Sequence, residues 1–275
     1  MELQALLAQP RALPSIPEAV ADLMTELDKD EPDLRRIGSL LASDPALTTR
    51  ALRLANSSFF NLQRQVASVQ EAAAVLGLAH VRTMVMAAAL GGAFRKVEGV
   101  NLEQFWRYSL NVGKIARTLA RAVKQDAGLA FTAGLVHALG DLVMHMGMPD
   151  DMRRLDFSVP PLALDRPQAE MSALGYTYSD VSAAFAAKWN FPDSIVNALK
   201  NLHAPFEGET YEMLAGVLHI AVWRARAQEV QLDANGLAAT YPDMVGLVMG
   251  LDLDSILDKD PEDWTSQGEL GAFIE

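Results

Sequence analysis

The sequence contains no cysteine among its 275 residues and has far fewer basic than acidic side chains. The absence of cysteine excludes disulfide scaffolds, thiolate zinc sites, iron–sulfur clusters and a cysteine nucleophile. It also favours an intracellular protein, and we expect a cytoplasmic location. The 23 lysines and arginines against 35 aspartates and glutamates give a net charge of −12. Because non-specific nucleic-acid binding relies on a net basic surface, we expect no nucleic-acid partner.

Long uninterrupted apolar runs are also scarce, although 50% of the residues are hydrophobic. The N-terminus has no basic start followed by an apolar run, so we expect no secretory signal. No stretch of about 18 uncharged apolar residues predicts a membrane span. The most apolar window, residues 83–94, is short and lies between Arg82 and Arg95.

Apolar side chains recur at three- and four-residue spacing along most of the chain, which predicts helices. Residues 131–148 predict one buried helix that ends near Pro149, and residues 159–167 predict a connection. No segment alternates apolar and polar residues for the length of a strand. The predicted fold class is therefore all-α, a compact multi-helix bundle without tandem repeats. Capping residues and helix breaks are predicted at Asp44-Pro45, at Ser68 with Glu71, at Gly77 and at Asn101.

Histidine and carboxylate are the only metal ligands that a chain with five histidines and no cysteine can offer. His137, Asp141 and His145 recur every four residues, so on one helix they share a face that drifts by about 40° per step. The outer two lie about 12 Å apart along such a helix, which is too far for all three to meet one ion. A lone buried histidine bonded to a backbone carbonyl is the commoner arrangement. No Walker loop, dinucleotide fingerprint, nucleophile elbow or H-E-x-x-H motif is present.

Several short strings occur along the chain in a characteristic order. They are Leu13-Pro14-Ser15-Ile16-Pro17-Glu18, Asp44-Pro45-Ala46-Leu47, Arg53-Leu54-Ala55-Asn56-Ser57, Val75-Leu76-Gly77-Leu78, Trp106-Arg107-Tyr108-Ser109, Gly134-Leu135-Val136-His137-Ala138-Leu139-Gly140, Trp189-Asn190-Phe191-Pro192 and Leu202-His203. Their order resembles the HDOD family, the HD-related output domains. The resemblance covers about residues 10–230, and we expect residues 231–275 to form C-terminal helices packed on the same single body of residues 1–275. It implies an HD-like helical bundle and a bacterial signalling module related in fold to metal-dependent HD phosphohydrolases.

The resemblance also implies that most metal-binding positions of the HD enzymes are lost. Tyr108 and Tyr178 stand where histidines would be, Ala138 replaces the aspartate of the His-Asp pair, and Leu202 replaces one histidine of a His-His pair. His137 and His203 remain. Alanine removes the carboxylate that would bridge two ions, and a phenol is a poor ligand because its pKa is near 10. We therefore expect no catalytic residue and no cofactor.

Three functions remain open on the sequence. The favoured one is a non-catalytic regulatory domain for signal transduction that acts by binding a partner protein. The second is a residual metal-dependent phosphohydrolase, a phosphodiesterase, with a divalent metal on His137, Asp141 and His203. The third is a sensor that binds a small ligand or a nucleotide in the vestigial cleft. The cleft residues are Trp106, Tyr108, His137, Asp141, Tyr178 and His203.

Overall fold

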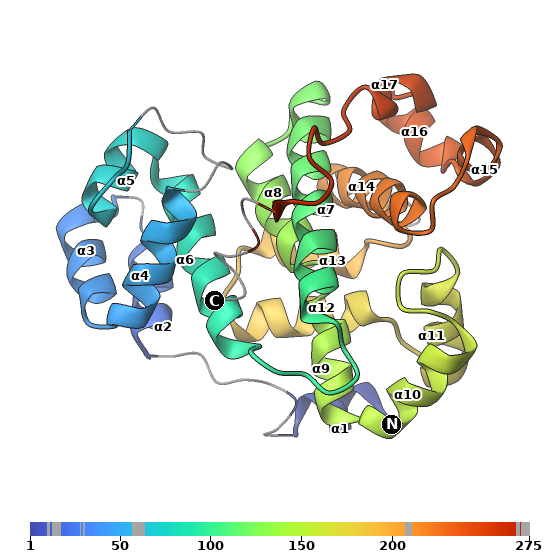
Figure 1. Cartoon of the computed structure of the whole chain (residues 1–275), viewed down its shortest axis with the longest axis horizontal. Helices are drawn as coiled ribbons and strands as arrows, with labels where there is room; N and C mark the ends of the chain where they lie inside the picture. Colours follow the sequence, from blue (N-terminus) through green and yellow to red (C-terminus); the bar gives the residue numbers. More distant parts are fainter. Residues whose placement is uncertain are drawn as a thin grey trace. The chain divides into compact units, whose positions relative to one another are not determined.

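A computed structural model of the chain shows an all-α protein, as the sequence predicts (Figure 1). The structure describes residues 1–9, 12, 18–27, 29, 31–56, 64–206, 211–267 and 270. The sequence string from Leu13 to Pro17 lies outside these residues, and no strand occurs within them. The helices are α1 Leu3–Leu7, α2 Glu18–Leu27, α3 Leu34–Ala42, α4 Pro45–Ala55, α5 Val69–Leu76, α6 Leu78–Ala93, α7 Leu102–Ala122, α8 Ala127–Val136, α9 Leu139–Gly147, α10 Pro149–Ser158, α11 Arg166–Leu174, α12 Tyr178–Lys188, α13 Asp193–Lys200, α14 Met213–Glu229, α15 Ala234–Thr240, α16 Asp243–Met249 and α17 Leu253–Leu257.

Contacts within the chain group it into two compact units. The smaller unit consists of Pro14–Lys96 and Thr265–Glu275, and the larger one of Met1–Leu13 and Val97–Trp264. In the smaller unit, α4 packs on α6 and α2 packs on α3. The helical spacing of the sequence carries no sign of a boundary after Lys96.

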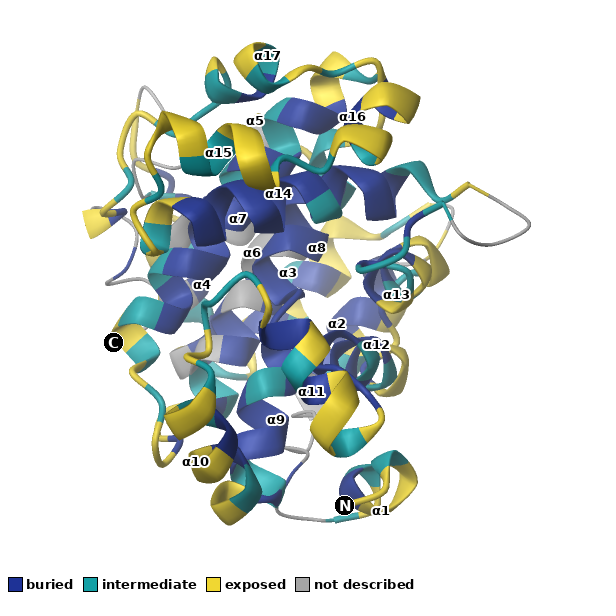
Figure 2. Ribbon diagram, turned by 90° about the vertical axis from the view of Figure 1, so that its right-hand side faces the viewer, coloured by how far each residue is buried: buried dark blue, intermediate teal, exposed yellow. Residues whose placement is uncertain are grey.

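The larger unit is built around α7 and α14, which are mostly buried (Figure 2). Helix α7 packs on α8 and α14, and α12 packs on α9 and α13. A Cβ atom at Gly134 would lie 2.7 Å from the Cα atom of Gly113, so these two glycines let the backbones of α7 and α8 approach closely. This core supports every residue of the site described below.

The C-terminal helices belong to the larger unit up to Trp264. Helix α16 packs on α14, and the side-chain amide of Asn111 in α7 donates a hydrogen bond of 2.9 Å to the carbonyl of Trp264. The guanidinium of Arg224 in α14 also lies 4.9 Å from the centre of the Trp264 ring. Residues 231–264 therefore extend the body that carries the family-like core.

Local capping signals lie where the sequence predicts them. The carboxylate of Asp44 accepts a hydrogen bond of 2.9 Å from the amide of Leu47, and the side chain of Asn101 accepts one of 3.1 Å from the amide of Gln104. Gly77 has a φ of +83°, which ends α5 and allows α6 to start at Leu78. Short-range backbone chemistry thus determines these helix starts.

The prediction of one helix over residues 131–148 is wrong. The helix breaks at His137 and Ala138, between α8 and α9. The hydroxyl of Ser182 in α12 lies at the break: it accepts a hydrogen bond of 2.8 Å from the amide of Gly140 and lies 2.7 Å from the carbonyl oxygen of His137. A side chain from a distant helix therefore satisfies backbone groups that a continuous helix would pair internally.

Within the described residues, only the stretch 127–147 is long and apolar enough to cross a membrane by length and composition. It spans α8 and α9, and 78% of its most apolar window is buried inside the protein. The core segment of a folded protein passes the same test, so this stretch is accounted for by its packing. The expectation that residues 83–94 are the most apolar window overlooked this stretch.

Candidate functional site

Four of the six predicted cleft residues form a continuous row of rings in the larger unit. The ring centroids of Tyr108 and His137 lie 5.1 Å apart, those of His137 and Tyr178 6.1 Å, and those of Tyr178 and His203 5.3 Å. All three pairs meet edge to face. The residues come from α7, the end of α8, the start of α12 and the turn after α13, so the row exists only in the folded chain.

A buried arginine that the sequence analysis did not select lies against this row. Arg226 belongs to α14, and its Nε donates a hydrogen bond of 3.1 Å to the hydroxyl oxygen of Tyr108. Its Nη1 donates one of 2.7 Å to the carbonyl of Ala163. The guanidinium carbon lies 5.1 Å from the centre of the Tyr178 ring, in cation–π contact. A permanent positive charge therefore lies within the cleft.

The hydrogen bonds of His137 form a chain with one consistent direction. Its Nδ1 lies 2.7 Å from the carbonyl oxygen of Gly134, which can only accept, so Nδ1 carries the proton. Its Nε2 then accepts the hydroxyl proton of Tyr108, 3.1 Å away. The Tyr108 oxygen in turn accepts from Arg226. Burial lowers the pKa of His137 to about 3, so the ring is neutral and both nitrogens are engaged.

The other end of the row is less well satisfied. The hydroxyl of Tyr178 and the Nε2 of His203 are buried and have no hydrogen-bond partner among the described residues. Burial raises the pKa of Tyr178, and burial together with the charge of Arg226 lowers the pKa of His203 to about 3. Both groups are therefore neutral at physiological pH.

Asp141 belongs to a separate network of charged side chains beside the row. Its backbone carbonyl lies 2.8 Å from Nδ1 of His145, and its carboxylate lies 3.5 Å from the same atom. The Nε2 of His145 lies 2.9 Å from the carboxylate of Asp156. Burial alone would lower the pKa of His145, but the hydrogen bond that its ring donates to Asp156 and the charge of Asp141 raise this pKa to about 9. Asp141 thus pairs with a protonated histidine of its own helix.

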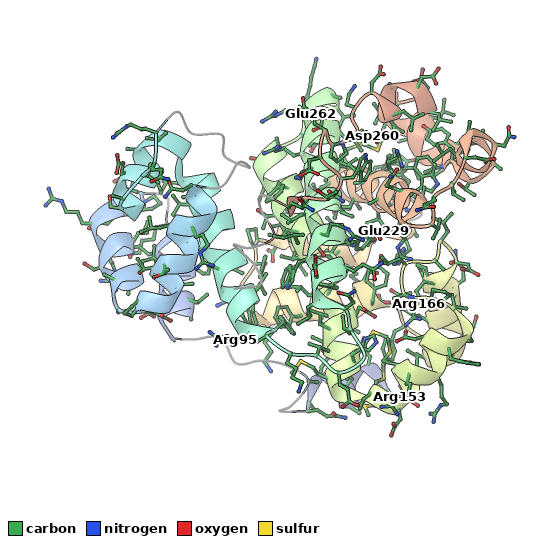
Figure 3. The ribbon with its side chains drawn as sticks, in the orientation of Figure 1. Arg95, Arg153, Arg166, Glu229, Asp260 and Glu262 are labelled. Atoms are coloured by element: carbon green, nitrogen blue, oxygen red, sulfur yellow. The ribbon has the colours of Figure 1, made fainter. Side chains whose placement is uncertain are left out.

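Arg166 extends this network to α12, and Figure 3 labels it on the larger unit. It lies 2.8 Å from the carboxylate of Asp156 and donates a hydrogen bond of 2.9 Å to Glu170. Glu170 also accepts a hydrogen bond of 2.7 Å from the amide of Tyr178. The network therefore fixes the first residue of α12, whose ring belongs to the row.

Trp106, the remaining predicted cleft residue, is buried elsewhere. Its ring meets that of Phe105 edge to face at 5.1 Å. Trp106 lines neither the small cavity beside Ala138 nor the larger cavity along α14, both described below. Two residues along a helix correspond to a rotation of about 200°, so Trp106 and Tyr108 leave α7 in opposite directions. The sequence strings that carry the resemblance cannot show this difference.

The space enclosed next to Ala138 is small. A cavity of about 20 Å³ is bounded by residues that include Tyr108, Ala138, Asp141 and Arg226. A single water molecule needs about 10 to 15 Å³ on this scale. The cleft therefore has room for about one water molecule and not for a pair of ions with their bound water.

These residues do not fit the divalent metal that the fold would imply. Within the described part of the chain, no three histidine, aspartate or glutamate side chains are grouped so that they could hold an ion. The alternative ligand set of His137, Asp141 and His203 is divided between the row and the charged network. His137 has no free lone pair while Tyr108 is bonded to it, and the guanidinium of Arg226 would repel a second cation.

The sequence matches the HDOD domain over residues 13–205. This chain belongs to the HDOD family. A solved structure from Shewanella amazonensis, named as a "putative phosphohydrolase", is 29% identical to it, with a TM-score of 0.77, and the match covers 98% of this chain and 96% of that one. A structure from Marinobacter aquaeolei, named as a "putative signal transduction protein", is 23% identical, with a TM-score of 0.70, over 99% of this chain and 64% of that one. These two solved structures thus share the fold of this chain, and their names suggest different activities.

An uncharacterized protein of Treponema pallidum is also similar to this HDOD chain. It is 26% identical over 217 residues, which are 76% of this chain and 41% of that protein. This chain therefore spans less than half of the length of that relative.

Proposed function

We propose that this HDOD protein is a non-catalytic regulatory domain that transmits a signal by binding a partner protein. The hydrogen-bond chain from Arg226 through Tyr108 to His137 carries the proposal. In an enzyme of this fold, a metal ion would supply the positive charge that activates water and stabilises phosphoryl oxygens. Here the guanidinium of Arg226 supplies a positive charge, but it cannot coordinate and activate water as a metal ion does. The hydroxyl of Tyr108 also donates to Nε2 of His137, the nitrogen that a metal ion would need.

Metal analysis tests the non-catalytic half of the proposal. We expect tag-free protein purified without chelator to contain less than one manganese, iron or zinc ion per chain, and titration with each metal to show no saturable binding. We also expect no hydrolysis of bis(p-nitrophenyl) phosphate in the presence of each metal. One tightly held ion per chain would contradict the proposal if it is lost in His137→Ala and kept in His219→Ala, the control for a half-buried histidine outside the row.

An exposed apolar face on α16 offers a surface for the partner. Met244 is 72% exposed and Leu247 is 74% exposed, and Val248 is exposed as well. Positions i, i+3 and i+4 share one face of a helix, so the three side chains are adjacent. Figure 2 shows exposed residues on this helix beside the buried α14. Contiguous exposed apolar side chains often mark protein interaction sites.

The double variant Met244→Glu with Leu247→Glu tests this surface. Because both side chains are exposed, we expect the free energy of unfolding to change by no more than about 0.5 kcal/mol. We expect the partner recovered by cross-linking in cells of the source organism to be lost. Met171→Glu is the matched control, because Met171 is 50% exposed on α11 of the same unit. Undiminished cross-linking in the double variant would exclude α16 as the partner surface.

A further inference from the structure

A second and larger cavity shares Arg226 as a lining residue with the small one. Its volume is about 250 Å³, and it is formed by α11, the turn after α13, α14 and the connection between α15 and α16. The volume is slightly below the range of about 300 to 1,000 Å³ that is typical of sites for drug-sized ligands. Its lining residues are Leu164, Pro167, Gln168, Leu202, His203, His219, Val222, Trp223, Arg226, Thr240 and Pro242.

Arg226 contributes a charge to this cavity and forms no ion pair with any described carboxylate. The side chain is only 3% exposed, yet within the described residues it forms two hydrogen bonds, both to neutral oxygens, and no ion pair. Its Nη2 has no hydrogen-bond partner there. Buried charges are normally paired, so a guanidinium without a carboxylate is an unusual group to hold at the wall of a cavity.

The rest of the lining is suited to an apolar body. No carboxylate of the described residues lines the cavity. The indole Nε1 of Trp223 already donates a hydrogen bond of 3.1 Å to the hydroxyl of Thr240, so Trp223 offers the ligand its ring and not its donor. Pro167, Pro242 and Val222 add further apolar surface. Two acids, Asp141 and Glu170, lie with Arg226 around the small cavity and are paired with His145 and Arg166.

We propose that this cavity binds a small organic carboxylate with a flat apolar body, whose carboxylate accepts hydrogen bonds from Arg226 while the body packs against Trp223. A carboxylate provides the missing counter-charge in a planar geometry that matches a guanidinium. The small volume limits the body to about the size of one ring. This site goes beyond the regulatory role proposed above, because its occupancy does not require a partner protein or a metal.

Benzoate is the first probe, with benzamide as its uncharged isostere and inorganic phosphate as an anion without a body. The indole N–H signal of Trp223, assigned by comparison with Trp223→Phe, reports on the cavity in ¹H–¹⁵N spectra. We expect benzoate to shift this signal saturably and to raise the melting temperature, because it binds the folded state. We expect benzamide to bind at least tenfold more weakly, and phosphate not to saturate in the same range.

Two variants separate binding in the cavity from binding elsewhere. Gln168→Trp adds a large side chain at an exposed lining position, and we expect it to abolish the benzoate response without loss of fold. Met171→Trp adds the same side chain one turn further along α11, outside the lining, and should leave binding unchanged. Arg226→Gln should remove the preference for benzoate over benzamide, and Gln168→Trp remains informative if Arg226→Gln does not fold.

Three results would each overturn this proposal. They are equal affinity for benzoate and benzamide, benzoate binding that survives Gln168→Trp, and no saturable response to benzoate. None of them bears on metal content or phosphodiester hydrolysis. The carboxylate site and the non-catalytic role can therefore fail independently.

Discussion

Gly140→Ala is expected to destabilise the larger unit strongly, because the added methyl group has no space in the core. A Cβ atom at this position would lie 2.0 Å from the carbonyl oxygen of Tyr178 and 2.6 Å from the amide nitrogen of Ser182. Both are backbone atoms of α12, so no side-chain rotation relieves the overlap. Helix α12 must move away from α9, at a cost on the order of 4 kcal/mol, which is a large part of a typical stability of about 5 to 15 kcal/mol.

Chemical denaturation followed by circular dichroism measures this loss. Gly236→Ala is the matched control, because its added Cβ would meet mainly the flexible side chain of Leu232, at 3.2 Å, in the exposed helix α15. We expect that control to change the free energy of unfolding by less than about 1 kcal/mol. If Gly140→Ala were no less stable than the control, the close contact between α9 and α12 would be refuted.

The contact between α9 and α12 explains why the sequence predicted the helix starts but not the break between α8 and α9. Asp44, Gly77 and Asn101 act on backbone groups within a few residues, so their effect can be read locally. The break at His137 depends on the Ser182 hydroxyl, 45 residues away in the chain, and no local pattern indicates it. The apolar spacing continues through the break because α8 and α9 are both buried in the same core.

Arg226 was missed for a related reason. Arginine within a helical pattern is usually assigned to a solvated face, and the sequence signal for Arg226 does not differ from that of an exposed arginine. Its partner Tyr108 lies 118 residues earlier. The resemblance to HD enzymes predicted which ligands are lost, and on that ground the sequence selected Tyr108, His137, Tyr178 and His203, whose rings lie in one row. It could not indicate the cation beside them, because none of the strings that carry the resemblance lies in α14, which supplies that cation.

Acid is expected to destabilise this protein well above the pH at which ordinary carboxylates protonate. The pKa of His137 and that of His203 are both lowered to about 3 by burial, against about 6.5 for an exposed histidine. Between pH 6.5 and 3 the unfolded chain binds these two protons and the folded chain does not, so stability is present above pH 6.5 and is lost as pH falls. At pH 5 each histidine lowers the free energy of unfolding by about 2 kcal/mol, and the two together lower it by about 4 kcal/mol.

The free energy of unfolding of His203→Leu, measured between pH 7 and pH 5, tests this origin. Leucine cannot take up a proton, so we expect the variant to lose about 2 kcal/mol less than the wild type over this range. Burial raises the pKa values of Asp141 and Glu170, so these two groups oppose the loss of stability at low pH. Both proteins contain them, so their contribution cancels when the loss in the variant is subtracted from the loss in the wild type. An equal loss in both proteins would show that His203 is protonated freely in the folded state.

His145→Asn provides a control of opposite sign. The pKa of His145 is raised to about 9, because the hydrogen bond to Asp156 and the charge of Asp141 outweigh the effect of burial. Its contribution to stability is therefore fully present below pH 6.5 and is lost as pH rises through about 9. His145→Asn should keep nearly all of the loss between pH 7 and pH 5 and should instead flatten the loss above pH 7. Opposite pH responses of His203→Leu and His145→Asn would show that the neutral row and the charged network are electrostatically distinct, although Tyr178 belongs to the row by its ring and to the network by its amide.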